Sequence, residues 1–188
     1  VGLVLFAPHK EFVYVIGDFI DWRVNESYMM HVTPNDSIYW ISIGGLTPGQ
    51  EYIYQYYIDG ELRIADPYTE KTSDPNDKYI PSATYPGLIS YPEGKADGIA
   101  SVLQTAQTDY TWKNTDFTPP AKNNLVIYEL LIRDFIESHN YQTLIDTLDY
   151  LDSLGVTAIE LMPFSEFEGN ESWGYNPSFY FAPDKYYC

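Results

Sequence analysis

The side chains best suited to chemistry in this sequence lie in an aromatic and polar stretch, residues 161–187. Trp173, Gly174 and Tyr175 follow one another there, and Asn176 comes next. An aromatic ring can cover the apolar C–H face of a pyranose, while amides and carboxylates bond the hydroxyl groups around its edge. A glycine between two rings lets the backbone approach a neighbouring segment closely. We interpret this stretch as a candidate sugar-binding loop, with simple packing of the loop as the alternative.

Hydrolysis of a glycosidic bond needs two carboxyl groups, one on each side of the bond. Nearby candidates are Glu129, Asp134, Glu160, Glu166 and Glu168. The sequence does not place any two of them at a catalytic separation. Glu129 and Glu160 lie in predicted strands, where a carboxylate could instead pair with Arg133. We expect structural or supporting roles for all of these carboxylates.

Other common catalytic and metal-binding motifs are missing from the sequence. His9, His31 and His139 are isolated, and no HExxH or CxxC pairing occurs, which argues against a transition-metal site. No GxGxxG motif, Walker loop or GxSxG motif is present. The usual phosphate-binding and acyl-transfer sites are therefore not predicted.

The composition is that of a folded protein of one large or two small domains, 188 residues long and rich in tyrosine. A net charge of −17 argues against a nucleic-acid partner and against an anionic membrane surface, whereas a neutral sugar polymer is indifferent to it. Cys188 is the only cysteine, so no internal disulfide is expected.

The beginning of the sequence carries no targeting signal that would fix a compartment. Residues 1–6 read as a strand rather than a signal peptide, and no apolar run is long enough to cross a bilayer. The missing initiator methionine suggests a trimmed chain. Localisation is therefore left unknown, and membrane insertion is not predicted.

Residues 1–86 are patterned for β-structure, with turn formers such as Asp59-Gly60 between the strands. The predicted strands are 2–6, 11–16, 38–43, 52–58 and 63–65. Short strands at this spacing predict an all-β, immunoglobulin-like sandwich. Residues 87–122 are punctuated by prolines and are predicted to form an extended connector.

Residues 123–188 show a different period, typical of a βαβ unit. We expect a buried strand at 125–128, a helix capped by Asn140 and running to about 154, a left-handed C-cap at Gly155, and a strand at 157–162. The predicted helix carries an apolar stripe made up of Leu144, Ile145, Leu148, Leu151 and Leu154. Its solvent-facing side is made up of Asp146, Asp149 and Asp152. A right-handed crossover would make the two strands parallel neighbours.

Three segments resemble the opening of the catalytic barrel of the α-amylase superfamily, glycoside hydrolase family 13. Residues 125–135 (LVIYELLIRDF) resemble its first strand and following loop, residues 155–163 (GVTAIELMP) its second strand, and residues 172–177 (SWGYNP) the segment before its third strand. The resemblance implies a (β/α)8 TIM barrel, of which this chain holds only the first β/α units. It also implies that Tyr175 stacks on a glucose ring just before the cleaved bond, with Trp173 and Asn176 shaping that subsite.

Residues 13–22 (VYVIGDFIDW) resemble the glycogen-binding-like sandwich, carbohydrate-binding module family 48, that often precedes such barrels. Glucan-binding versions of that sandwich use a second Trp and a Lys, where this chain has Leu62 and Gln55. Trp22 remains as a candidate glucan-binding residue on the sandwich. A purely structural role for the sandwich is the alternative.

The family resemblance implies an enzyme that cleaves or transfers α-1,4 or α-1,6 glucosidic bonds of starch or glycogen with retention of configuration. Its Asp nucleophile, Glu acid/base and second Asp follow later strands, so no catalytic residue is expected in this fragment, which should be inactive by itself. The resemblance leaves hydrolase, branching and debranching activities open. Calcium occurs in some relatives, but no cofactor or metal site can be assigned here. A non-catalytic glucan-binding or scaffold module is the alternative function.

Overall fold

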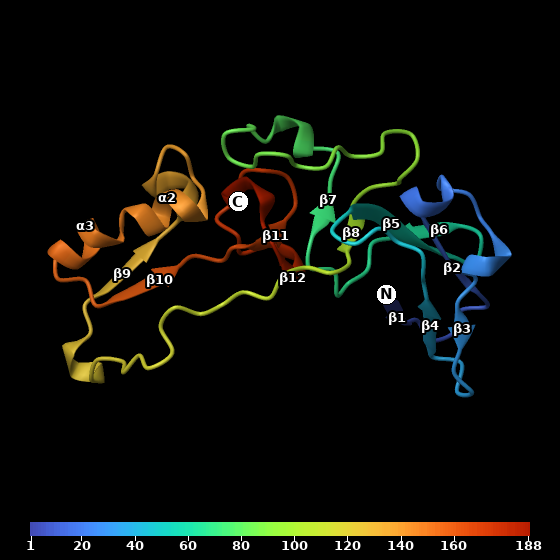
Figure 1. Ribbon diagram of the computed structural model, residues 1–188, viewed down its shortest axis with the longest axis horizontal. Helices are drawn as coiled ribbons and strands as arrows, with labels where there is room; N and C mark the ends of the chain where they lie inside the picture. Colours follow the sequence, from blue (N-terminus) through green and yellow to red (C-terminus); the bar gives the residue numbers. More distant parts are fainter. The chain divides into compact units, whose positions relative to one another are not determined.

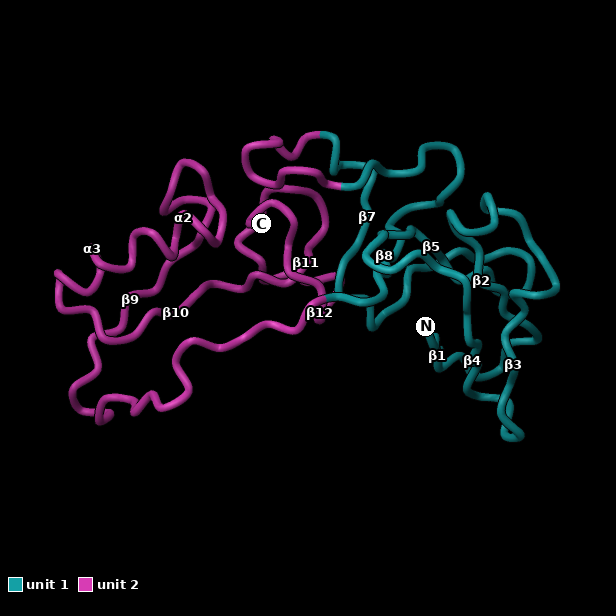
Figure 2. The backbone as a smooth tube through the Cα atoms, viewed as in Figure 1, with its two compact units in different colours: residues 1–78, 89–107 teal, residues 79–88, 108–188 magenta.

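The computed structural model describes residues 1–188 and is mostly β-structure with a few short helices. Figure 1 labels its elements, and Figure 2 colours its two compact units. Unit 1 contains residues 1–78 and 89–107, and unit 2 contains residues 79–88 and 108–188. Short 3-10 helices accompany the strands at η1 (Asp18–Ile20), η2 (Glu26–Tyr28), η3 (Asp77–Tyr79), η4 (Lys122–Asn124) and η5 (Lys185–Tyr187).

Unit 1 is built from two antiparallel sheets. The smaller sheet has the order β1-β4-β3, with strands β1 (Gly2–Phe6), β4 (Ile38–Ser42) and β3 (His31–Val32). The larger sheet has the order β2-β5-β8-β7, with strands β2 (Val13–Gly17), β5 (Glu51–Ile58), β8 (Ala100–Gln104) and β7 (Thr72–Ser73). The short strand β6 (Leu62–Ile64) pairs with β5 through the turn at Asp59-Gly60.

The two sheets of unit 1 share one hydrophobic core. Side chains alternate between buried and exposed along β1 and β4, as expected for strands with one face inward. The inward side chains of both sheets form a single cluster that includes Leu3, Leu5, Val13, Val15, Tyr39, Ile41, Tyr54 and Tyr56. Burial of these apolar faces against each other, at about 25 cal/mol per Å2, is the main stabilisation of unit 1.

The second face of the larger sheet is also covered. Ile16, Ile53 and Val102 pack there with Trp22 and with Ile89 from the segment before β8. Gln55 fastens this segment, because its side chain donates to the carbonyl oxygens of residues 97 and 99, at 2.7 and 2.9 Å. Strand β8 lies inside residues 87–122, which were predicted to be an extended connector. The prediction is therefore wrong for Ala100–Gln104. Its pairing with β5 depends on a distant strand and has no local signal.

Unit 2 contains the predicted strand, helix and strand. β9 (Ile127–Leu130) and β10 (Ala158–Leu161) are parallel neighbours, which confirms the predicted pairing of the two strands. The short helix α1 (Ile132–Phe135) follows β9 directly. Beyond β10, the strands β11 (Ser165–Phe167) and β12 (Pro177–Pro183) form an irregular antiparallel pair. The hydrophobic core of unit 2 includes Leu130, Leu131, Ile132, Leu144, Leu151, Phe167 and Tyr187.

The single helix predicted to run to about residue 154 is instead two helices, α2 (Tyr141–Asp146) and α3 (Leu148–Ser153). The break is at Thr147, whose hydroxyl donates to the carbonyl oxygen of Leu144 at 2.8 Å and competes with the helical bond. The predicted caps are confirmed: Asn140 accepts from the N–H of Thr143 at 2.9 Å, and Gly155 has a φ of +83°.

The break also divides the predicted apolar stripe. Leu144 and Leu151 are buried, whereas Ile145, Leu148 and Leu154 are exposed. The aspartates predicted to face solvent, Asp146, Asp149 and Asp152, are all exposed. None of the helices has the length and apolar character that spanning a bilayer would require.

Candidate functional site

The aromatic loop lies against the carboxyl end of β10. A Cβ added to Gly174 would lie 2.1 Å from the carbonyl oxygen of Pro163, which comes two residues after β10. Gly174 also has a φ of +84°, a conformation that L side chains rarely adopt. Two separate causes therefore require glycine at this position: the left-handed backbone conformation, and the lack of room for a Cβ atom. This contact sets the place of the two rings on either side of it.

Ser172 anchors the start of the loop to the carboxyl end of β9. Its carbonyl oxygen accepts from the Arg133 guanidinium at 3.4 Å and from the Tyr187 hydroxyl at 3.5 Å. Arg133 belongs to α1, just after β9. The Ser172 hydroxyl accepts from the N–H of Gly174 at 3.0 Å. The loop is thus held at the carboxyl ends of both parallel strands, the edge where α/β barrels place their sites.

The two aromatic rings of the loop remain open to solvent. Trp173 is 63% exposed and Tyr175 is 65% exposed. Asn176 is also exposed, but its side-chain oxygen accepts from the Ser172 hydroxyl, so this amide braces the loop. The structure therefore brings together the three predicted residues, with two rings available to a ligand and one amide partly used.

Arg133 carries its own counter-ion. Its Nε donates to Asp134 Oδ1 at 2.8 Å, and a second N–H donates to Oδ2 at 3.3 Å. The hydrogen bond from Arg133 holds the pKa of Asp134 below its usual range and raises the pKa of Arg133. Burial raises the pKa of Tyr187 to about 12, so its hydroxyl stays a donor to the loop. At neutral pH, Arg133 and Asp134 are therefore charged and the Tyr187 hydroxyl is protonated.

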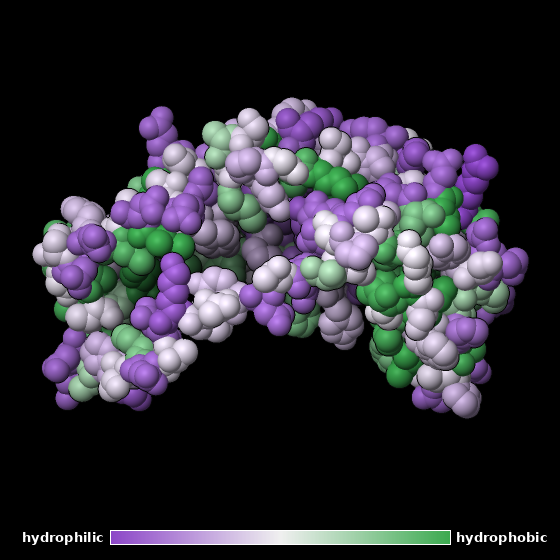
Figure 3. Space-filling view, viewed as in Figure 1, coloured by the Kyte–Doolittle hydropathy of each residue, from purple (hydrophilic) through white to green (hydrophobic).

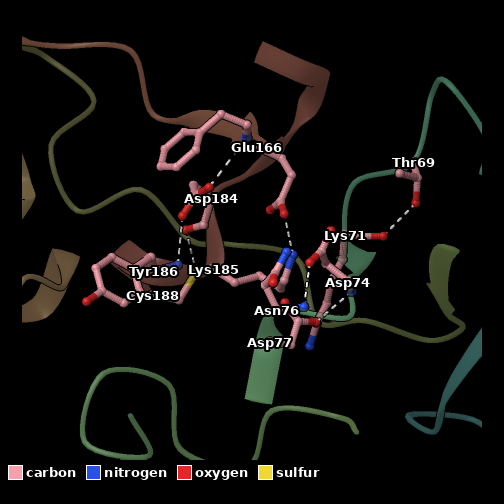
Figure 4. A network of polar contacts seen from close by, with 11 residues as sticks. Thr69, Lys71, Asp74, Asn76, Asp77, Glu166, Asp184, Lys185, Tyr186 and Cys188 are labelled. Carbon is pink, nitrogen blue, oxygen red and sulfur yellow. Dashed lines mark hydrogen bonds and ion pairs between the residues drawn. The ribbon is translucent and has the colours of Figure 1, made fainter. Parts of the chain in front are cut away.

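The other predicted carboxylates do not gather near the loop. Glu129 and Glu160 are exposed and lie directly opposite each other in the parallel pair. Arg133 pairs with Asp134 instead of either of them. Glu168 is exposed, whereas Glu166 is buried in β11 and forms an ion pair with Lys185 (Figure 4).

Asp184 is a buried carboxyl that the sequence did not single out. It accepts from the N–H of Tyr186 at 2.8 Å, capping η5, and from the N–H of Phe167 at 3.5 Å (Figure 4). Burial and, to a smaller extent, the charge of Glu166 raise the pKa of Asp184 to about 7, against the lowering effects of these hydrogen bonds and of the Lys185 charge. The sequence signal was an Asp two residues before the N–H that it caps.

This pKa predicts a pH-dependent stability. Because the folded pKa of about 7 lies above the ordinary 3.8, the contribution of Asp184 is fully present below about pH 4 and is lost as the pH rises through 7. Asp184→Asn keeps the cap and removes the titration, so it should abolish a loss on the order of 2–4 kcal/mol. Urea unfolding at both ends of this range would measure it. Asp152→Asn, at an exposed position, is the matched control; equal pH slopes for wild type and Asp184→Asn would contradict the prediction.

Trp22 occupies a different environment from the loop aromatics. It is only 8% exposed and packs in the cluster on the covered face of the larger sheet. Its indole N–H donates to Asp18 at 2.8 Å. A sugar needs an open ring face, so the burial of Trp22 favours the packing role over the glucan-binding role that the sequence left open. Gln55 is buried on the same face, while Leu62 is exposed.

The family resemblance raised the possibility of a calcium site, because some relatives bind calcium. No group of three or more His, Cys, Asp or Glu side chains in residues 1–188 is arranged to hold a metal ion.

The fold of the chain is similar to part of two solved structures. A structure of pullulanase complexed with maltotriose, from Anoxybacillus sp. LM18-11, matches 99% of this chain and 27% of its own with a TM-score of 0.69 at 21% identity. A Salmonella typhimurium protein assigned as an alpha amylase matches 99% of this chain and 26% of its own, with a TM-score of 0.70 at 23% identity.

The homologues of the chain are 1,4-alpha-glucan branching enzymes and malto-oligosyltrehalose trehalohydrolases. The trehalohydrolase of Saccharolobus solfataricus is 29% identical over 126 residues, which cover 67% of this chain and 21% of the relative. The branching enzyme GlgB of Corynebacterium jeikeium is 26% identical over 193 residues, which cover 100% of this chain and 24% of the relative. The chain thus spans about a quarter or less of these two relatives. No family model matches it.

Proposed function

We propose that these residues are the N-terminal portion of an α-amylase-superfamily enzyme that cleaves or transfers α-1,4 or α-1,6 bonds of starch-type or glycogen-type glucans with retention. Unit 1 is the immunoglobulin-like sandwich of carbohydrate-binding module family 48 type, and the β9-to-β10 part of unit 2 opens the (β/α)8 barrel. The catalytic carboxylates lie outside the 188 residues. The substrate is an α-glucan, and neither a nucleic acid nor a membrane is a partner.

One observation carries this proposal: the solvent-exposed ring of Tyr175 at the carboxyl end of two parallel strands. The ring is 65% exposed, so its face is open to a pyranose, and the adjacent backbone at Gly174 lies close to Pro163. The homologues support glucan chemistry by their printed names, and the pullulanase structure with maltotriose supports it independently.

The carboxylates of this chain support the view that it lacks the reacting pair. Glu166 is tied to Lys185, and Asp134 to Arg133. Glu129 and Glu160 face the same side of adjacent strands rather than the two sides of a cleaved bond. A retaining glycosidase needs its two carboxyls about 5 Å apart with a sugar between them. No pair described here is arranged with such a role beside Tyr175.

In the full-length enzyme, Tyr175→Ala is expected to lower kcat/KM on malto-oligosaccharides by about tenfold or more, because the stacking contact to the substrate is removed. Steady-state kinetics with a series of malto-oligosaccharides would measure this. Tyr180→Ala is the matched control, since Tyr180 is a similarly exposed ring (75%) but belongs to strand β12 and not to the segment around Gly174. Unchanged kinetics of Tyr175→Ala would remove the stacking role.

The function as a whole is tested by expressing the complete open reading frame and assaying it on starch, glycogen and pullulan. Cleavage, branching or debranching products are expected, and the product pattern assigns the activity. Binding of these glucans without any turnover would support the non-catalytic scaffold instead.

A further inference from the structure

The smaller sheet of unit 1 has an exposed apolar face with an aromatic centre. Its outward side chains are Val4 and Phe6 on β1, and Ile38 and Trp40 on β4, exposed by 55%, 65%, 36% and 44%. Val4 is directly opposite Trp40, and Phe6 is opposite Ile38. Apolar side chains gather over β1 and β4 in the space-filling view (Figure 3). We call this surface the Trp40 face.

Polar groups without protein partners flank the Trp40 ring. His31 on β3 is the cross-strand neighbour of Trp40, with ring centroids 4.7 Å apart. The indole N–H of Trp40 and the ring nitrogens of His31 make no hydrogen bond to another residue. An aromatic face with free N–H donors at its edge matches the two surfaces of a sugar ring, namely its C–H patch and its hydroxyls.

The absence of charged side chains on the Trp40 face favours a neutral ligand. Its outward positions on β1 and β4 carry no Asp, Glu, Lys or Arg, although the chain has a net charge of −17. A neutral ligand pays no electrostatic cost at such a surface, while an anionic ligand is repelled by the remainder of the chain. On the larger sheet, the segment held by Gln55 packs over the outer face, and Trp22 is buried there.

We propose that the Trp40 face is an accessory binding surface for a neutral oligosaccharide, an α-glucan, which stacks on Trp40 and bonds to the Trp40 and His31 nitrogens. The choice of an α-glucan rests on the proposed function, whereas the surface chemistry stands independently of it. This surface belongs to unit 1 and uses none of the residues of the Tyr175 loop.

The experiment follows the indole N–H signals of the 188-residue chain by NMR during titration with maltoheptaose. The chain has four tryptophans, so each candidate surface has its own reporter. The Trp40 signal is expected to shift in a saturable manner, while the Trp22 signal, whose N–H is bonded to Asp18, stays in place. Trp173 reports on the loop, and Trp112 is an exposed control in unit 2.

Trp40→Ala should weaken maltoheptaose binding to unit 1 by about tenfold, which is the worth of one aromatic stacking contact. His31→Ala should weaken it by a smaller factor. Both side chains are exposed, and an unchanged Trp22 signal would show that the sandwich remains folded. Tyr175→Ala should leave the shift of the Trp40 signal unaltered.

The outcomes separate the two proposals. A shift of Trp173 alone overturns the Trp40 face and leaves the proposed function standing. A shift of Trp40 alone upholds the face and removes support from the Tyr175 loop. A Trp40 signal that responds to dilution of the protein but not to maltoheptaose would identify the face as a contact between copies of the chain and overturn the proposal, as would no response at all.

Discussion

Gly174→Ala is expected to destabilise unit 2 by about 4 kcal/mol or more and to release the aromatic loop. The added Cβ would meet the Pro163 carbonyl oxygen at 2.1 Å and its carbon at 2.8 Å, and both atoms belong to the backbone. A backbone neighbour cannot turn away as a flexible side chain can, so the strand end or the loop must move. The positive φ of the position adds a further cost of about 1–3 kcal/mol.

Gly169→Ala is the matched control for this prediction. Gly169 has a φ of +76°, close to that of Gly174, but nothing lies within 4 Å of its added Cβ. It should cost only about 1 kcal/mol, so the difference between the two variants isolates the contact with Pro163. Hydrogen exchange of peptides that cover β10 and the loop would measure both losses. Equal exchange in the two variants would show that the contact does not fix the loop.

Asp66→Ala is expected to destabilise unit 1 by about 4 kcal/mol. The carboxylate of Asp66 is buried and accepts from the hydroxyls of Tyr54 and Tyr56 at 3.0 and 2.8 Å. Burial raises the pKa of both tyrosines, so both hydroxyls remain protonated donors. Removing the shared acceptor leaves two buried donors unpaired, at roughly 1–3 kcal/mol each.

Two further variants separate the hydrogen bonds from the packing. Asp66→Asn keeps an acceptor oxygen and should lose less than half as much as Asp66→Ala. Adding Tyr54→Phe and Tyr56→Phe to Asp66→Ala removes the unpaired donors and should recover part of the stability. Hydrogen exchange of peptides from β5 would report the loss in unit 1 alone. A loss below about 1 kcal/mol for Asp66→Ala would contradict a buried role for this carboxylate.

The parts of the fold that sequence could predict are those with local causes. The strand Gly2–Phe6 was placed at its observed bounds, and β4, β5, β6, β9 and β10 were placed within two residues of theirs. The caps at Asn140 and Gly155 follow from the chemistry of single residues. In contrast, β8 forms because β5 has a free edge, and neither partner signals this locally. The break at Thr147 depends on one hydroxyl within an otherwise regular pattern.

The candidate site was predicted in its residue types but not in its supports. Tyr175 and Trp173 were chosen for their chemistry, and both are exposed. Arg133 lies 39 residues before Ser172, and no sequence pattern links the two. Pro163 belongs to the same stretch as the loop, but nothing in the sequence shows that Gly174 approaches its carbonyl group. Trp22 remained a candidate on the sandwich because sequence does not show which face of a sheet is covered.

The position of β5 at the centre of the larger sheet has a consequence for the order of folding. β5 pairs with β2 before it in the chain, with β6 immediately after it, and with β8 only after the whole stretch 65–99 has been added. During synthesis on the ribosome, the edge of β5 at Glu51–Tyr54 therefore stays unpaired until β8 has emerged. An unpaired strand edge with aromatic residues invites association with other nascent chains. We expect this interval to be when a folding chaperone has the most effect on the yield of unit 1.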